Sequence, residues 1–154
     1  MKKYYEYGNH PWNYGLKGAQ KWTSGQKEKY YNSLNKNGWY RKSKAEQKVY
    51  LELVERYGES DVICQYSKDE RYPFNCDFYV KSKDLFIEVN SFWHHGPHRF
   101  DENNEKDIEL LKQWEEKAKS SQQYKNAINT WTIRDKNKIE TAKKNNLNYI
   151  TIYN

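Results

Sequence analysis

The chain has 154 residues, a formal net charge of +6 and 17% aromatic residues. Its length fits one domain, and it has no apolar run near the ~18 residues of a membrane span, which argues against a membrane-embedded class. The basic surplus lies in the N-terminal third, because residues 1–48 hold eleven Lys/Arg and three Asp/Glu. A basic chain favours an anionic partner, with nucleic acid as the first candidate.

The pattern of residues predicts an N-terminal arm followed by alternating helices and strands. Residues 1–42 lack steady periodicity and are expected to be extended, with a short helix over 23–34. Ser43 and Glu46 form a capping-box pattern that opens a helix, and Gly58 stops it. The elements expected after residue 42 are helix 43–57, strand 61–66, hairpin strands 73–80 and 84–90, helices 104–119, 122–130 and 135–145, and strand 147–153.

This order of elements predicts an α/β fold. The last helix should return the final strand parallel to a central strand through a right-handed crossover. We therefore expect a mixed central sheet of about four strands, flanked by helices on both faces, with an extended basic N-terminal arm.

Two cysteines, Cys64 and Cys76, each lie in a strand-like apolar stretch and lack metal-ligand spacing. They could pair, but we interpret both as reduced core residues, which fits a cytoplasmic protein. No apolar segment follows the N-terminal Met1–Tyr5, so we expect no signal peptide.

The arm interleaves aromatic and basic side chains. Lysine and arginine neutralise phosphate, while aromatic rings stack on bases or sugars. We expect these residues to contact nucleic acid, although a solvated tail whose aromatics pack on the core is the alternative. The residues concerned are Lys17, Lys21, Trp22, Lys27, Lys29, Trp39, Arg41 and Lys42.

The predicted hairpin carries one carboxylate on each strand, Asp77 and Glu88. Buried carboxylates are costly unless they are paired or bind a metal. Two of them on adjacent strands suggest Mg²⁺ held by oxygen ligands, with Mn²⁺ able to substitute. The alternative is that Asp77 caps a turn and Glu88 pairs with a lysine. Asn90 should project from the same strand face as Glu88, or else end the strand as a turn residue.

A histidine cluster follows the second acidic strand, at His94, His95 and His98. A histidine beside a bound metal could act as general acid or base, because its pKa lies near neutrality. A surface loop with scattered imidazoles is the alternative. Zinc is disfavoured, since a structural site wants four Cys/His ligands.

Two further acids are candidates for the same site. Glu46 is either the capping-box glutamate or an inward group that binds a catalytic water, and the capping geometry argues against both roles at once. Asp135 is either a first-turn acid favoured by the helix dipole or a late member of the active site. Basic residues around Asp135 could touch phosphates, namely Arg134, Lys136 and Lys138.

These residues together resemble the PD-(D/E)xK nuclease superfamily. Asp77 matches its first acid, and Glu88-Val89-Asn90 matches its E-x-K element with Asn in place of Lys. Within it, the chain is similar to the branch that contains the very-short-patch mismatch-repair endonuclease and phage homing endonucleases with a Glu/Asp/His/Asp catalytic set. That likeness rests on the order of Asp77-Phe78-Tyr79-Val80, Phe92-Trp93-His94-His95 and Arg134-Asp135, and covers roughly residues 43–154.

The resemblance implies a restriction-endonuclease-like core over residues 43–154, with residues 1–42 as a DNA-contacting arm. It implies a catalytic set of Glu46, Asp77, Asp135 and one histidine. An ungapped match on Phe92-Trp93 selects His94, whereas phage relatives of the Trp-Thr-His-Gly type select His95; we favour His95 and keep His94 and His98 open. Asp77 and Glu88 would hold the metal.

The resulting prediction is a Mg²⁺-dependent DNA endonuclease of phage or mobile-element homing type, acting in the cytoplasm of a bacterial or phage-infected cell. It would nick one strand or cleave both, and double-strand cleavage could use a homodimer. A catalytically inactive nucleic-acid-binding protein on the same fold is one alternative. A structure-specific or RNA nuclease is the other, because phosphodiester chemistry is common to DNA and RNA.

Overall fold

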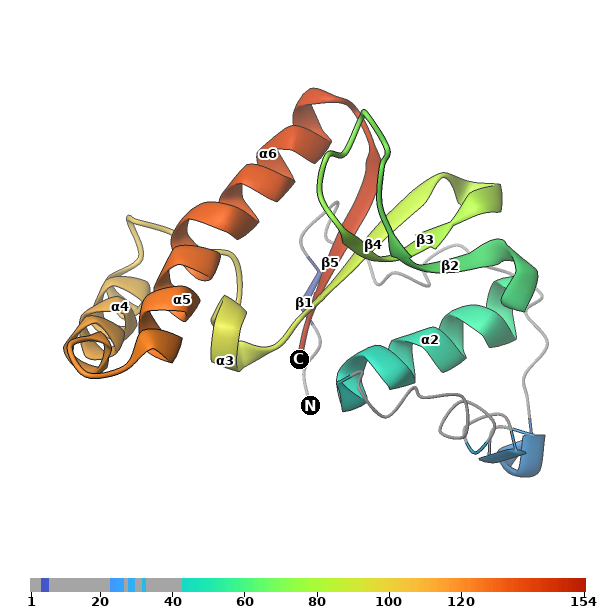
Figure 1. Ribbon diagram of the computed structural model, residues 1–154, viewed down its shortest axis with the longest axis horizontal. Helices are drawn as coiled ribbons and strands as arrows, with labels where there is room; N and C mark the ends of the chain where they lie inside the picture. The colour runs from blue at the N-terminus through green and yellow to red at the C-terminus, as the bar shows by residue number, and fades with distance from the viewer. Residues whose placement is uncertain (1–3, 6–22, 27, 30–31, 33–42) are drawn as a thin grey trace.

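The structure is a computed structural model that describes residues 4–5, 23–26, 28–29, 32 and 43–154. Its centre is an open mixed sheet with the strand order β1-β5-β4-β3-β2 (Figure 1). Four strands make up most of this sheet, and a two-residue strand adds to one edge. The strands are β1 (Tyr4–Tyr5), β2 (Val62–Tyr66), β3 (Cys76–Val80), β4 (Leu85–Asn90) and β5 (Asn148–Tyr153). The predicted α/β class and mixed sheet are confirmed.

The strands β3 and β4 form the predicted antiparallel hairpin. A 3₁₀ turn, Lys81–Lys83, and a left-handed Asp84 (φ 45°) connect them. All six residues of β4 are buried, as expected for a central strand covered on both faces. The final strand β5 runs parallel to β4, as predicted. Glu88 of β4 lies opposite Thr151 of β5.

Helix α2 (Lys44–Tyr57) covers one face of the sheet. Its first turn is closed by the predicted capping box, in which Ser43 accepts from the Glu46 amide and Glu46 accepts from the Ser43 amide. Its apolar stripe, with Val49 and Leu53, packs on Phe78, Ile87 and Ile152 from three strands. The helix ends at Gly58, also as predicted.

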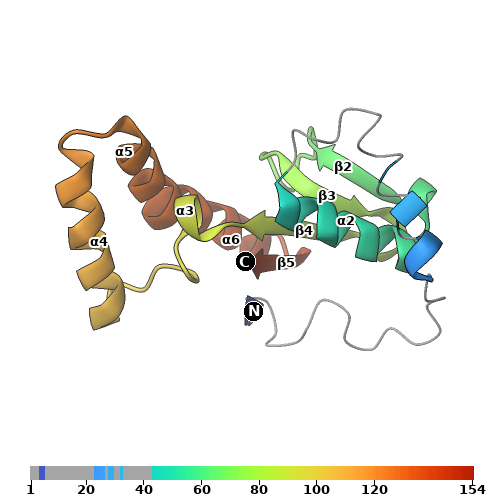
Figure 2. The ribbon, with the colours of Figure 1, turned by 90° about the horizontal axis from the view of Figure 1, so that it is seen from below.

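Helix α6 (Asp135–Lys144) covers the opposite face. Ile139 and Ala142 of this helix pack with Phe86 and Tyr149 of the sheet and with Tyr72, which lies between β2 and β3. Figures 1 and 2 show α2 and α6 on opposite sides of the sheet. This arrangement places the ends of both helices beside the acidic hairpin.

A smaller helical group lies beside the sheet, on the left in Figures 1 and 2. It contains α3 (Phe92–His95), α4 (Glu105–Ala118) and α5 (Gln122–Asn129), with Trp114, Ala127 and Trp131 in its core. A π-helical turn, η4 (Thr130–Arg134), joins α5 directly to α6. The elements predicted from the sequence left residues 92–95 and 131–134 outside any helix, and the structure differs at both places. Four residues are too few to show a helical period, and a wide turn disturbs the 3.6-residue repeat.

Gly96 ends α3 and lies against the ring of Trp131. Its φ is +67°, and a Cβ added there would lie 2.3 Å from Trp131 Cε2. The ring cannot withdraw easily, because Trp131 is fully buried and its Nε1 donates to His98 O at 2.7 Å. The position therefore requires glycine for two separate reasons.

We expect Gly96→Ala to lower the free energy of unfolding more than Gly58→Ala does. Gly58 also has a positive φ (+87°), but no atom lies within 4 Å of its would-be Cβ. Backbone strain should cost each variant about 1–3 kcal/mol, and overpacking should add a further ~1–3 kcal/mol at Gly96 alone. Urea unfolding of both variants measures the difference, and equal losses would contradict the steric argument.

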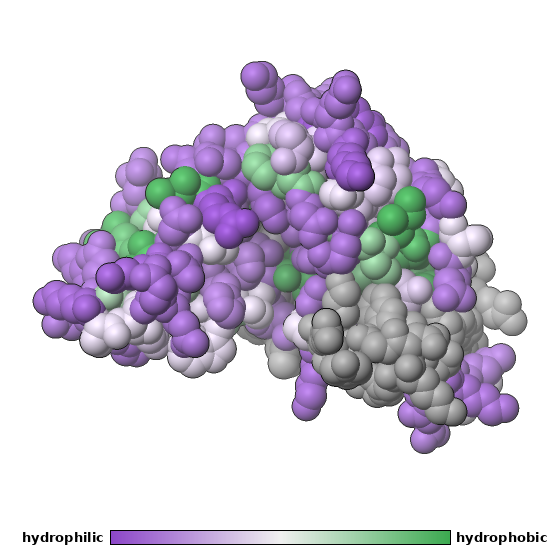
Figure 3. Space-filling model, in the orientation of Figure 1, coloured by the Kyte–Doolittle hydropathy of each residue, from purple (hydrophilic) through white to green (hydrophobic). Residues whose placement is uncertain are grey.

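Other features of the described residues bear on earlier expectations. Cys64 and Cys76 are both free, and Cys76 is buried. Within the part of the arm that is described, residues 24–26, 28–29 and 32 are helical, in the range predicted for a short helix. No helix in the described ranges has the length and apolar character needed to cross a membrane. The face seen in Figure 3 is mostly hydrophilic, with hydrophobic residues in small separate patches.

Candidate active site

A cleft of about 500 Å³ lies where the start of α2, the β3–β4 hairpin and the start of α6 meet. It combines the predicted carboxylates of the hairpin with a histidine of α3 and basic side chains of η4 and α6. The residues that line it are Ser43, Ala45, Glu46, Phe74, Asn75, Asp77, Glu88, Val89, Asn90, Ser91, His95, Arg134, Asn137 and Lys138.

Asp77 lies where β3 and β4 separate. The paired register of the hairpin ends at Phe78 and Ile87. Beyond this point the Asp77 side chain replaces the backbone pairing, because its Oδ2 accepts a hydrogen bond from the Val89 backbone amide at 2.8 Å. Its Oδ1 accepts from Gln65 Nε2 at 3.4 Å. Asp77 therefore does not cap a turn, and both of its oxygens keep a second lone pair.

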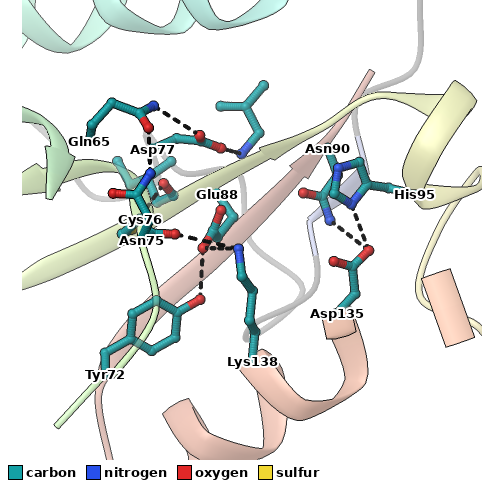
Figure 4. Close-up of polar contacts among 12 residues, drawn as sticks. Gln65, Tyr72, Asn75, Cys76, Asp77, Glu88, Asn90, His95, Asp135 and Lys138 are labelled. Carbon is teal, nitrogen blue, oxygen red and sulfur yellow. Dashed lines mark hydrogen bonds and ion pairs between the residues drawn. The ribbon is translucent and has the colours of Figure 1, made fainter. Parts of the chain in front are cut away.

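Glu88 is the most deeply buried acid of the cleft, at 3% exposure. Its Oε1 accepts from the Tyr72 hydroxyl at 2.7 Å and from Lys138 Nζ at 2.9 Å (Figure 4). The alternative in which Glu88 pairs with a lysine is confirmed, and the lysine comes from α6. Because both donors use Oε1, the second carboxylate oxygen of Glu88 is left for another ligand.

Asp77 and Glu88 are close enough for the charge of Asp77 to raise the pKa of Glu88. Burial raises the pKa of Asp77, and the nearby Glu46 carboxylate raises it further, whereas the Val89 amide lowers it. Burial also raises the pKa of Glu88, to about 8, against the opposing effect of Lys138. Burial opposes the charge of Lys138 too, yet the Glu88 carboxylate raises the pKa of this ammonium. A cation bound beside these carboxyls would favour their charged forms, because a nearby opposite charge lowers the pKa of an acid.

The raised pKa of Glu88 predicts how stability depends on pH. The folded protein holds this proton up to about pH 8, whereas the unfolded chain loses it near 4.5. The stability that the proton contributes is complete below pH 4.5 and is lost as the pH rises through 8. Between pH 5 and 9, the wild type should lose at least ~1 kcal/mol more unfolding free energy than Glu88→Gln, because one pKa unit corresponds to about 1.4 kcal/mol.

Urea unfolding at pH 5, 7 and 9 measures these two slopes. The exposed Glu115 of α4 provides the control, and Glu115→Gln should follow the wild-type curve. Parallel curves for the wild type and Glu88→Gln would show that Glu88 does not titrate in this range.

A histidine–carboxylate pair forms the opposite wall of the cleft. His95 Nδ1 donates to Asp135 Oδ2 at 2.7 Å, and the Asp135 side chain is 5% exposed. Asn90 Nδ2 lies 3.5 Å from the same oxygen (Figure 4). Asn90 was predicted to project from the same strand face as Glu88, and on that face it reaches Asp135. With Nδ1 held by Asp135, the Nε2 of His95 is the nitrogen able to exchange a proton with a bound molecule. Asp135 is the first residue of α6 and so lies in its first turn, as the alternative supposed, and the same side chain also holds His95.

Glu46 lies in the cleft wall while it completes the capping box. Its Oε2 accepts from the Ser43 amide at 2.9 Å, and its charge acts on the pKa of Asp77. Glu46 therefore caps α2, as one of its two predicted roles required, and it also lines the cleft because the N-terminal end of α2 faces Asp77. Its binding of a catalytic water stays a prediction.

The other two histidines lie away from the carboxylate pair. His94 is exposed and lines a separate small cavity with Trp93 and Tyr124. His98 lies in the loop before α4. Its Nε2 lies 2.9 and 3.0 Å from the two carboxylate oxygens of Asp107, which belongs to α4. Of the three candidates, the structure brings only His95 into the cleft of Asp77 and Glu88. The alternative of a loop with scattered imidazoles is wrong, since two of these histidines hold buried carboxylates.

The basic residues near Asp135 divide between two sides of α6. Arg134 and Lys138 line the cleft together with Asn137, as their helical spacing allows. Lys136 lines a different cleft, beside His98. Of the arm residues predicted to contact nucleic acid, Lys29 is described and is exposed. The others lie outside the described residues, namely Lys17, Lys21, Trp22, Lys27, Trp39, Arg41 and Lys42.

Three contributors to the cleft were not recognised as partners of its carboxylates from the sequence. Lys138 was predicted only as a phosphate contact, although its place three residues after Asp135 puts both on one helix face. Tyr72 and Gln65 carried no local signal, because they reach Glu88 and Asp77 from a loop and a neighbouring strand.

The donor set of the cleft fits a hard divalent cation. Mg²⁺ is commonly bound by one or two carboxylates and keeps several waters, which matches one available oxygen edge on each of Asp77 and Glu88. Within the described ranges no three His, Cys, Asp or Glu side chains are grouped so that they could hold a metal ion.

Comparisons of the chain with protein-family models, with curated proteins and with solved structures find no match.

Proposed function

We propose that the protein is a metal-dependent endonuclease that hydrolyses phosphodiester bonds of DNA, on a restriction-endonuclease-like core. The observation that carries the proposal is the composition of the cleft. It is lined by the carboxylates Glu46, Asp77 and Glu88 together with His95, Arg134 and Lys138. Asp135 holds the Nδ1 of His95. A phosphodiester is negatively charged and its accompanying divalent cation is positively charged, so together they complement the basic and acidic side chains of the cleft.

Asp77 and Glu88 are the residues that would hold Mg²⁺ or Mn²⁺. Such a cation polarises the scissile phosphate and stabilises the leaving oxygen. Arg134 and Lys138 line the same cleft, where their positive charge would neutralise phosphate oxygens. The lysine missing from strand position 90 is thereby replaced by an ammonium from α6, held 2.9 Å from Glu88.

His95 is the group suited to proton transfer. Asp135 holds its Nδ1, which orients the ring. Its Nε2 can then remove a proton from the attacking water or deliver one to the leaving oxygen. Asn90 supports the pair from β4, since its amide reaches the same Asp135 oxygen.

Exposed aromatic side chains on the helix that carries His95 favour a nucleic acid over a small phosphate ester. Phe92 and Trp93 precede His95 on α3, and they are 46% and 65% exposed. Exposed rings of this kind provide stacking surfaces for bases. DNA is the substrate that we propose, in agreement with the expectation for the basic arm.

Plasmid cleavage tests the proposal. Supercoiled DNA is incubated with the protein in Mg²⁺, Mn²⁺ or EDTA, and a gel-shift assay in Ca²⁺ runs in parallel at several salt concentrations. We expect nicked or linear product only with Mg²⁺ or Mn²⁺, and binding that weakens steeply with salt. Binding without cleavage of any DNA would instead support an inactive DNA-binding protein. Cleavage of single-stranded RNA alone would identify a ribonuclease.

A further inference from the structure

We propose that Gln65 is a positioning residue for Asp77, and that its left-handed backbone directs its side chain to this carboxylate. The inference rests on the proposed function, since it assigns Asp77 to a cation site. Gln65 was not among the residues that the sequence singled out. It lies on β2, one strand away from the acidic hairpin.

The backbone of Gln65 is unusual for a residue in a strand. Its φ is +52° between the rungs Cys64–Phe78 and Tyr66–Cys76, which leaves Gln65 opposite Asp77. A positive φ is uncommon outside glycine, and such strain is often found at functional sites. Gln65 is exposed, so burial of its side chain does not account for the conformation.

The side chain of Gln65 links Asp77 to the loop before β3. Its Nε2 donates to Asp77 Oδ1 at 3.4 Å, and its Oε1 accepts from Asn75 Nδ2 (Figure 4). The Val89 amide holds the other Asp77 oxygen at 2.8 Å. The carboxylate is therefore held from both neighbouring strands, which fixes its rotation about the side-chain axis.

The same loop also connects this arrangement to Glu88. The backbone oxygen of Asn75 accepts from Lys138 Nζ at 3.5 Å, and that ammonium is bonded to Glu88. Gln65 and Asn75 thus join the supports of both carboxylates. Residues that orient metal ligands in this way typically change metal affinity about 10–100-fold when they are replaced.

Calcium titration calorimetry of two Gln65 variants tests the role without relying on cleavage. Gln65→Gly removes the amide and relieves the backbone, whereas Gln65→Asn keeps an amide and tolerates a positive φ but is one methylene shorter. We expect both to bind Ca²⁺ at least ~10-fold more weakly than the wild type. The melting temperature of Gln65→Gly should not fall, because the strain is gone.

Asn146 provides a matched control, since it is also exposed with a positive φ (56°) but lies in the turn before β5. Asn146→Gly should keep the wild-type Ca²⁺ affinity. If Asp77→Asn abolishes Ca²⁺ binding while both Gln65 variants stay within twofold of the wild type, the positioning role is wrong and the proposed function stands. If the wild type itself binds no Ca²⁺, both are overturned.

Discussion

Asp77→Asn is expected to reduce metal-dependent DNA cleavage by at least ~1,000-fold, a loss of about 4 kcal/mol in transition-state stabilisation. The change removes one of the two carboxylates on adjacent strands that would hold the cation. The change retains the shape of the side chain. The side-chain oxygen of asparagine can still accept the hydrogen bond from the Val89 backbone N–H, which Asp77 accepts at 2.8 Å. Because burial raises the pKa of Asp77, removing its charge should leave the fold as stable as the wild type or more so.

Plasmid cleavage, Ca²⁺ calorimetry and thermal unfolding of the same preparation separate these effects. Glu115→Gln on the exposed face of α4 is the control for loss of a carboxylate, and it should cleave as the wild type does. A folded Asp77→Asn protein that cleaves at the wild-type rate would remove Asp77 from the active site.

His95→Ala should reduce the single-turnover cleavage rate by about 10²–10⁴-fold, the range of a general acid or base. Only His95 among the three histidines of residues 94–98 lies in the carboxylate cleft, with Nδ1 2.7 Å from Asp135. Its loss should spare Ca²⁺ binding, because the ligands that we propose are Asp77 and Glu88.

His94→Ala is the matched control for this experiment. His94 is adjacent on the same short helix but is exposed and lines a different cavity. Rates are compared at saturating protein over pH 6 to 9. A larger loss in His94→Ala than in His95→Ala would reverse the assignment, in favour of the ungapped match on Phe92-Trp93.

Local sequence signals determined the elements that carry the acids. Ser43 and Glu46 specified the start of α2 and Gly58 its end, because capping depends on residues within one turn. The alternation around the turn at residues 81–84 predicted the hairpin, since its register follows from the turn and from burial. From that register alone, Asp77 could be placed beside Glu88, and Asn90 could be placed on the same face of the sheet as Glu88.

Only the tertiary structure decided how those acids are supported and which histidine joins them. The choice of His95 depends on α3 and on the wide turn η4, which positions Asp135; neither element has a local period to reveal it. Lys138 meets Glu88 across 50 positions, and Gln65 meets Asp77 from another strand. Contacts between distant segments depend on how helices pack on the sheet, and packing is set by the whole core rather than by any short stretch of residues.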